Sequence, residues 1–559
     1  MCLKPAPVRP MPTDIGTWGA KHLAAESPYR YVGDTLYSQW QEADFADLYH
    51  PEGKPALSPV LLALVTIFQR YEHLGDRAAV HAVRTRLDWK YALHLPLDDD
   101  GFDASVLCEF RQRLLDHNAE ARLFDTVLTQ LKTEGYFRQR GTQRTDSTHV
   151  LAMVRALNRI ETVGETMRAT LNAIAQAAPA WLVAHADAAW VDRYAARFDE
   201  GRLPETDAKR QALALQIGND GYRLLAAIDA VDAPLALRDL PMVHILRQVW
   251  IQQFYQDAEQ QRWRTPDELP PASVAINSPY DPEARYSSKH STKWVGYKVH
   301  YSETCDDEQP RVITNVELTP APLPDTEMTD TIHTHLKAAD RLPATHLVDA
   351  GYVDAEHLVE SQRDYQIDLC GPVPVESSWQ ARAKEGYVAA DFPIDWEANH
   401  ATCPQGHHSA HWKDATDPHG NTIIHVEFAR AQCQACPVVA HCTHSTHRGR
   451  QLTIRPKESY LALQAARARQ QTPAFKEQYA QRAGMEGTLS RGVRACGMRR
   501  SHYQGEDKTH FQELCIAAGI NIARVAAHRA GIPPAPKRTP ALVRVLTPAL
   551  APQPAVTMA

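Results

Sequence analysis

The sequence lacks a long apolar segment. Its best apolar run, Pro59 to Phe68, has ten residues, about half of what a helix needs to cross a bilayer. The N-terminal stretch MCLKPAPVRPMPTD is rich in proline and has no apolar core of the kind that marks a secretory signal. We therefore expect no membrane span and a protein that stays inside the cell, in the cytoplasm.

Cysteine is also scarce, with 10 residues in a chain of 559. This number excludes a disulfide scaffold, and in a reducing cytosol the clustering of cysteines carries more information than their number. Internal repeats and heptads are absent from the sequence, which excludes repeat arrays and coiled coils. The 44% hydrophobic and 23% charged residues are typical of a globular chain, and the length predicts about three or four domains.

Charge is distributed unevenly along the chain. The formal net charge is −7, yet the segment from Thr443 to Ala559 has 18 Lys and Arg against 6 Asp and Glu, which gives it +12 and leaves −19 for the rest. Such an asymmetry predicts one basic surface on an acidic body and favours a nucleic-acid partner. A solvated basic tail is the alternative.

The first part of the chain reads as helical. We expect a flexible leader over residues 1–30 and a helical N-terminal domain over residues 31–138, in which Ser58 and Pro59 form a typical helix start. Short helices with tight turns suit a helix-turn-helix-like DNA module and a plain bundle equally well.

The rest predicts an α/β class with two insertions. The expected segments are a first strand in 139–150, a helical insertion in 151–275, the continued mixed-sheet core in 276–375, an insertion with a cysteine cluster in 376–472, a long helix over 473–495 and a second one over 507–528 within 473–530, and a Pro-rich tail in 531–559. Strands are expected over Trp294 to His300, over Arg311 to Leu318, before Asp349 and over 366–373, with helices over 326–339 and 354–365.

Three acids occupy favourable positions in this pattern. Asp146 lies within the first strand, Asp349 follows a later strand, and Glu486 lies on the long helix. If the strands of Asp146 and Asp349 are neighbours, their carboxylates lie side by side and need a cation, and oxygen ligands select Mg²⁺ or Mn²⁺. Each acid taken alone is most simply a surface or capping residue.

Tyr479, Arg482 and Glu486 have the i, i+3, i+7 spacing of one helix face. The Glu could bind a metal ion while the Arg binds phosphate. An exposed Arg–Glu pair, with a stabilising effect of a few tenths of a kcal/mol, is the alternative, and the spacing alone favours it.

Four cysteines gather between Asp349 and Glu486: Cys403, Cys433, Cys436 and Cys442. A Cys-x₂-Cys pair supplies half of a tetrahedral site, which favours a structural Zn²⁺ over an iron–sulfur cluster or over unbound reduced cysteines. His407, His408, His441 or His444 could replace one thiolate.

Four motifs follow one another along the chain: RTDSTHV, HLVDAGYVD, YAQRAGMEGTLSRGVR and RRSHYQGEDKTHFQELCIAAGINIARV. Together they resemble the DDE transposases of bacterial insertion sequences, and SKHSTKWVGYKVH and CPQG…CQACPVVAHCT also look like segments of this family. The similarity is to the group with a Tyr-x₂-Arg-x₃-Glu signature and covers roughly residues 35–530.

The resemblance implies an RNase H-like core in which Asp146, Asp349 and Glu486 bind two Mg²⁺ or Mn²⁺ ions. It implies cleavage of double-stranded DNA at the terminal inverted repeats of a transposon and strand transfer into target DNA, by a homodimer on DNA in the bacterial cytoplasm, associated with the nucleoid. By the same resemblance, Tyr479 and Arg482 contact DNA near the cleaved phosphate.

Further cations surround Glu486 and are expected to bind DNA phosphates: Arg491, Arg494, Arg499, Arg500 and Lys508. One position departs from related groups, in which a Lys follows the Glu, because Val493 occupies it. Arg494 is turned by about 100° on a helix from that position, which puts its substitution for the Lys in doubt.

Other functions stay open at this point. An RNase H-like nuclease would cut DNA without joining strands, and a transposase-derived DNA-binding protein would have lost catalysis, although the intact acid trio argues against that. A zinc-dependent interaction module would explain the cysteines but none of the acids.

Overall fold

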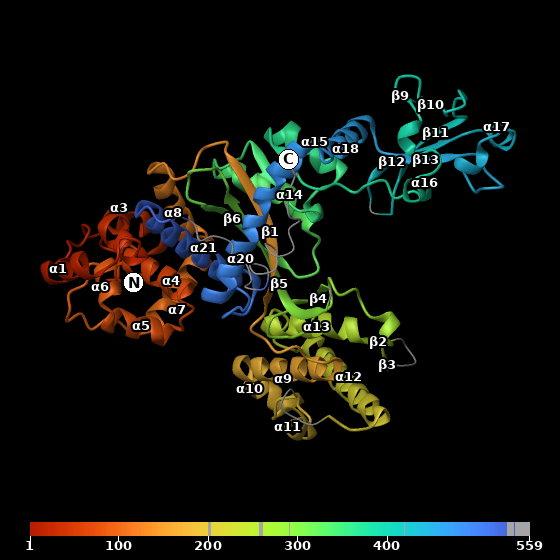
Figure 1. The fold of residues 1–559 in the computed structure, drawn as a ribbon. Coiled ribbons are helices and arrows are strands. Elements are labelled where there is room, and N and C mark those ends of the chain that lie inside the picture. The colour runs from red at the N-terminus through yellow and green to blue at the C-terminus, as the bar shows by residue number, and fades with distance from the viewer. Residues whose placement is uncertain (199–202, 257–260, 290, 419, 534–541, 543–559) are drawn as a thin grey trace, which may run out of the picture.

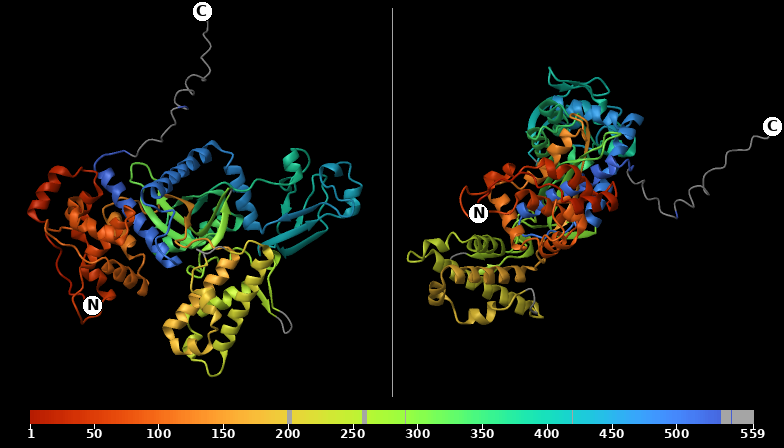
Figure 2. Two further views of the ribbon diagram at one scale, coloured as in Figure 1. Left: turned by 90° about the horizontal axis from the view of Figure 1, so that it is seen from below. Right: turned by 90° about the vertical axis from the view of Figure 1, so that its left-hand side faces the viewer.

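The computed structural model describes residues 1–198, 203–256, 261–289, 291–418, 420–533 and 542. A central sheet lies between helices of the N-terminal region on one side and a strand-rich insertion on the other, while a helical insertion projects from a third side (Figures 1 and 2). Within the described residues no helix is long and apolar enough to span a bilayer. The predicted Pro-rich tail lies mostly outside the described residues.

The central sheet is mixed, as predicted. Its strands run in the order β4 (Arg285–Lys289), β5 (Thr292–Thr304), β1 (Thr142–Leu151), β7 (Thr345–Leu347) and β8 (Asp368–Cys370), and β6 (Ile313–Pro320) pairs with β5. The first strand is antiparallel to β5 and parallel to β7, and β7 is parallel to β8. This α/β arrangement is consistent with the RNase H-like core that the resemblance implied.

Helices cover both faces of this sheet. One group shares a small core with the strands β7 and β8 and consists of α14 (Met328–Ala338), α15 (Ala355–Tyr365) and α18 (Lys457–Arg469). On the other face lie α20 (Gly484–Ala495) and α21 (Glu506–Arg529), and α21 contributes buried side chains along most of its length. This helix is buried on nearly every side because it lies between the sheet and the N-terminal helices.

The N-terminal region contains α1 (Thr13–His22), α2 (Pro28–Tyr31), α3 (Tyr37–Gln39), α4 (Pro59–Tyr71), α5 (Asp76–Thr85), α6 (Leu87–Ala92), α7 (Ser105–Asp116) and α8 (Arg122–Thr133). Of these, α2, α4 and α8 pack directly on α21, and α2 to α8 share its hydrophobic core. The predicted cap is confirmed, since the Ser58 hydroxyl accepts a hydrogen bond from the Leu61 amide. The flexible leader predicted for residues 1–30 is wrong: α1 forms there, and Cys2 and Ile15 are buried.

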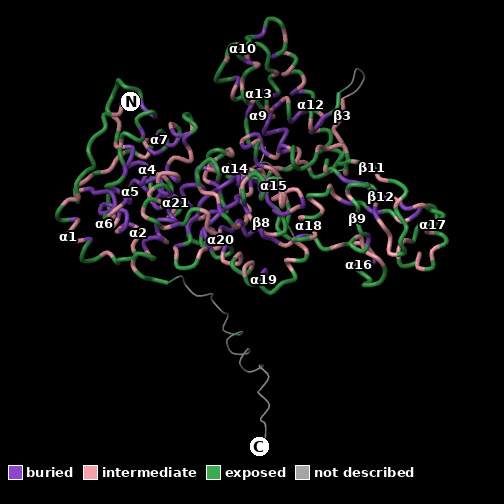
Figure 3. The backbone as a smooth tube through the Cα atoms, turned by 90° about the horizontal axis from the view of Figure 1, so that it is seen from above, coloured by how far each residue is buried: buried purple, intermediate pink, exposed green. Residues whose placement is uncertain are grey.

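Each insertion has a core of its own. The helical insertion consists of α9 (Arg159–Ala177), α10 (Pro179–His185), α11 (Ala189–Tyr194), α12 (Asp207–Asp229), α13 (Pro241–Gln253), β2 (Phe254–Gln256) and β3 (Gln261–Trp263). The cysteine-containing insertion consists of α16 (Trp379–Ala383), β9 (Ile394–Asp395), β10 (His400–Ala401), β11 (His411–Thr416), β12 (Thr422–Glu427), α17 (Arg430–Gln434) and β13 (Gln451–Ile454). Figure 3 shows both projecting from the largely buried centre.

The single long helix predicted over residues 473–495 is interrupted. The structure has α19 (Pro473–Ala480), a 3₁₀ turn (Gln481–Ala483) and then α20. The interruption has a local cause, because the Arg144 guanidinium donates to the Gln481 carbonyl and lies against Gly484, where any Cβ would collide with it.

Candidate active site

The register of the sheet places Asp146 beside Asp349. Arg144 of β1 is paired with Leu347 of the parallel strand β7, so the positions two residues further on, Asp146 and Asp349, lie next to each other. The prediction that their strands are neighbours is therefore confirmed. The Asp349 carboxylate also accepts the Gly351 amide at 2.7 Å, which fixes its direction at the end of the strand.

Arg482 links the two carboxylates. Its Nη2 lies 2.8 Å from Asp146 Oδ2 and 3.6 Å from Asp349 Oδ2. The three side chains are only 15 to 30% exposed, so the shared positive charge counts for more than it would at the surface. Two acids that share one cation have the donor chemistry and the closeness that a hard divalent ion requires, so these residues fit such an ion.

The electrostatic environment of Asp146 matches this arrangement. Burial raises the pKa of its carboxyl, the charge of Asp349 adds to that rise, and Arg482 opposes it. Tyr479 stacks on Phe475, with ring centroids 5.5 Å apart, and burial likewise raises the pKa of its hydroxyl next to the same acids. Arg482 and Tyr479 therefore both lie at the acid pair, although their spacing alone favoured an exposed Arg–Glu pair.

Glu486 occupies a different environment. It is exposed on α20, one turn beyond Arg482, and among the described residues it forms no hydrogen bond or ion pair. The part of the chain that the structure describes also holds no group of three or more His, Cys, Asp or Glu side chains arranged to hold a metal ion. The structure thus unites two of the three predicted acids, and the role of Glu486 stays a prediction.

A buried ionic network behind the acids was missed by the sequence analysis. Glu303 of β5 is completely buried and accepts hydrogen bonds from Arg144 at 2.8 Å, Arg524 at 2.8 Å and the Thr488 hydroxyl at 2.6 Å. Burial alone would raise its pKa, but the two guanidinium groups outweigh burial and hold the pKa below its usual value. The network ties β1 and β5 to both C-terminal helices and so fixes where α20 begins.

A second group near the acids was also missed. The Lys298 ammonium forms an ion pair with Asp325, and the Ser147 hydroxyl donates to the same carboxylate at 3.3 Å. Ser147 follows Asp146 in β1, and its amide donates to the Asp146 carboxylate at 2.9 Å. Asp325 therefore helps to hold this part of β1 in place. The motif SKHSTKWVGYKVH, which contains Lys298, was the available signal.

The five further cations that are predicted to bind DNA phosphates are all on the surface. Arg491, Arg494, Arg499, Arg500 and Lys508 are exposed. Arg491 donates to the Tyr71 hydroxyl at 2.8 Å and so contacts the N-terminal domain. Val493 packs against the main hydrophobic core, which explains why an apolar residue suits the position where related groups have a Lys.

The four clustered cysteines line one small cavity of about 30 Å³ together with His407. All four are unpaired and partly buried, and Cys403, Cys433 and Cys442 pack against the core of their insertion. Because the described residues contain no metal-holding group, the structure gives the predicted Zn²⁺ site no support.

Comparison with protein families finds two matches. A family model described as Transposase DDE domain matches residues 402–526, and one described as Transposase domain (DUF772) matches residues 19–113. The first contains Tyr479, Arg482, Glu486 and the clustered cysteines, whereas Asp146 and Asp349 lie outside it. Searches of curated proteins and of solved structures find no match. The two family matches support a DDE transposase of the insertion-sequence type.

Proposed function

We propose that the chain is a metal-dependent DNA transposase that cuts double-stranded DNA at transposon ends and joins those ends to target DNA. The observation that carries the proposal is the pairing of β1 with β7, which sets Asp146 beside Asp349 with Arg482 between them. The transposase family matches support the same function.

Asp146 and Asp349 would hold two Mg²⁺ or Mn²⁺ ions, with Glu486 as the third carboxylate. When bound, such ions activate the attacking oxygen and stabilise the leaving oxygen of a phosphodiester. The protein's own part is to fix the two carboxylates through the sheet and the Gly351 amide. Arg482 and Tyr479, at the mouth of this pair, would bind the phosphate of the strand to be cut.

Double-stranded DNA, as terminal inverted repeats and as target, is the proposed partner. The exposed cations Arg491, Arg494, Arg499, Arg500 and Lys508 supply charges for its phosphates. Two transposon ends must be handled together, so we propose a homodimer on DNA, located in the bacterial cytoplasm with the nucleoid.

The test is a strand-joining assay with the full chain, Mg²⁺ and an oligonucleotide duplex that carries a pre-cleaved 3′-hydroxyl transposon end. We expect joined products from the natural chain, their loss in Asp146→Asn, and normal yield from the control Asp414→Asn, which changes an exposed acid on β11.

Two other results would separate the rival functions. Cleavage without joined products would favour an RNase H-like nuclease. Unchanged DNA binding and no reaction in either metal would favour a transposase-derived DNA-binding protein, and either result would overturn the proposal.

A further inference from the structure

The hairpin of β4 and β5 projects beyond the strand that carries Asp146. Leu151, the last residue of β1, is paired with Gly296 of β5. The preceding residues of β5, from Thr292 to Trp294, are paired with β4 alone, whereas the Val295 carbonyl still accepts the Ala152 amide at 3.0 Å. Three residues of strand correspond to roughly 10 Å, so the hairpin extends beyond the other strands of the sheet.

This hairpin contains cations but no acids. From Arg285 to Ser302 the sequence has no Asp or Glu, although the chain as a whole is acidic. Lys289 and Lys293 are exposed, and within the described residues they form no hydrogen bond or ion pair. The other two cations of this stretch are engaged, since Arg285 donates to the Ser273 carbonyl and Lys298 pairs with Asp325.

A second pair of cations meets the hairpin at the end of β1. On the edge of β1 opposite β5, the Leu151 amide donates to the Arg499 carbonyl at 2.8 Å and the Leu151 carbonyl accepts the Ser501 amide at 2.9 Å. The side chains of Arg499 and Arg500 are exposed and have no partner among the described residues. Unpaired cations therefore flank the end of β1 on both sides.

These cations act on the groups of β1. The charges of Arg499 and Lys289 both help to lower the pKa of His149, for which burial is the main cause. The neighbouring acids Glu283 and Glu506 lie instead at the base of the hairpin, near Arg285. The free end of the hairpin is thus positive, and it extends beyond the end of β1 away from the acid pair.

We infer that Lys289, Lys293, Arg499 and Arg500 form one basic track that binds the phosphates of duplex DNA leading away from the acid pair. The inference rests on the proposed function and adds a contact surface to it. Duplex DNA is the occupant that fits, because the hairpin also exposes the hydroxyl groups of Ser288, Ser291 and Thr292 beside its lysines, and hydroxyl and ammonium groups are the usual donors to phosphate oxygens.

The test measures the binding of the full chain to a random-sequence duplex over a range of salt concentrations, with a chelator present so that no reaction occurs. The logarithm of the association constant falls linearly with the logarithm of the salt concentration, and each lost phosphate contact makes this negative slope shallower by about 0.9. Lys289→Ala with Lys293→Ala should therefore make it shallower by about 1.8. The matched control, Lys209→Ala with Lys413→Ala, replaces two exposed lysines of the insertions and should leave the slope unchanged.

A slope equal to that of the natural chain in the hairpin variant would overturn the inference, provided that circular dichroism and thermal melting show both variants to be folded. A lowered affinity for polyglutamate with an unchanged DNA slope would also overturn it, in favour of an acidic protein partner. The binding assay contains no metal ion and measures no reaction. Loss of strand joining in Asp146→Asn therefore tests the proposed function and does not test the basic track. A natural chain that binds no duplex would overturn both.

Discussion

Two buried glutamates show how the partners of a residue decide its charge. Glu303 is completely buried with two arginines, and its pKa lies below the usual value. Glu513 on α21 is equally buried, but within the described part of the chain its side chain has only the Tyr301 hydroxyl and the Gln512 amide as donors, and burial raises its pKa to about 8. Glu303 is therefore a charged carboxylate that stabilises its ionic network, whereas Glu513 is a neutral carboxylic acid in the folded protein.

Glu513 should make the stability of the protein depend on pH. Its pKa in the folded state lies above the value of an unfolded chain, 4.5, so its stabilising contribution is complete below about pH 4.5 and is lost as the pH rises to about 8. In that window the free energy of unfolding should fall with a slope of up to ~1.4 kcal/mol per pH unit from this group. Urea denaturation at several pH values measures the slope.

Glu513→Gln should flatten this slope, because a glutamine cannot ionise. Glu458→Gln, an exposed glutamate on α18, is the control and should leave it as in the natural chain. An identical slope in Glu513→Gln would contradict the assignment of a neutral buried acid.

At the residue scale, the sequence allowed the acids to be predicted but not their partners. Asp146 and Asp349 belong to recognisable motifs, and the strand pattern places Asp146 within one strand and Asp349 directly after another. Arg144 donates a hydrogen bond to the carbonyl of Gln481, which is 337 residues away in the chain. A local sequence pattern cannot predict a contact between residues so far apart. Glu486 illustrates the same limit. The sequence pattern predicted which helix face carries it, but its position relative to the other two acids depends on how α20 packs against the sheet.

Among the elements, the start of α20 is the point on which the site depends. Arg144 occupies the space beside Gly484, and the carbonyl of Gln481 accepts its other hydrogen bond. Glycine is required at position 484 for this close approach and not for backbone freedom, because residues 484 to 495 form a regular helix. Gly487, one turn later, has open space where a Cβ would be.

This contrast supplies a matched pair of variants in one helix. Gly484→Ala should push the Arg144 guanidinium away, disturb its bond with Glu303 and reduce strand joining by about tenfold or more, since one misplaced charged hydrogen bond accounts for ~1.5 kcal/mol. Gly487→Ala should raise the free energy of unfolding by up to ~1 kcal/mol because alanine favours a helix. Joining assays and urea denaturation check both, and equal activity of the two variants would contradict the role of Arg144.

The sequence predicted most elements because their patterns are local. The strands that carry or adjoin the acids, and the helices α14 and α15, follow apolar periodicity within a few residues of the expected bounds. The break after α19 and the strand β4 were missed for tertiary reasons. The helix is interrupted by a side chain of β1, and Arg285–Lys289 becomes a strand because β5 extends far enough to pair with it.

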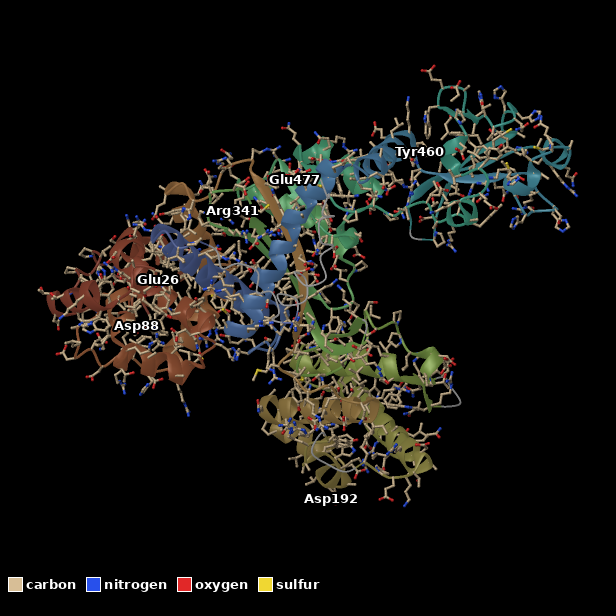
Figure 4. All side chains as sticks on the ribbon, viewed as in Figure 1. Glu26, Asp88, Asp192, Arg341, Tyr460 and Glu477 are labelled. Carbon is tan, nitrogen blue, oxygen red and sulfur yellow. The ribbon has the colours of Figure 1, made fainter. Side chains whose placement is uncertain are left out.

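The whole molecule has one main hydrophobic core and two insertions with separate cores. The main core runs from Tyr29 to Ala526 and joins the N-terminal helices to the sheet through α21. Arg341, labelled in Figure 4 between these parts, adds an ion pair with Asp125 of α8. The order of the motifs was enough to predict the α/β class, but the shared core was not predictable, because it is built from contacts across most of the chain.

The proposed chemistry depends most on whether the carboxylates hold divalent ions. An Mn²⁺ titration followed by electron paramagnetic resonance, with duplex DNA present, measures this directly. We expect two Mn²⁺ ions per chain, with loss of binding in Asp146→Asn and in Asp349→Asn and normal binding in the control Asp414→Asn. Mn²⁺ binding that both substitutions leave unchanged would contradict the account.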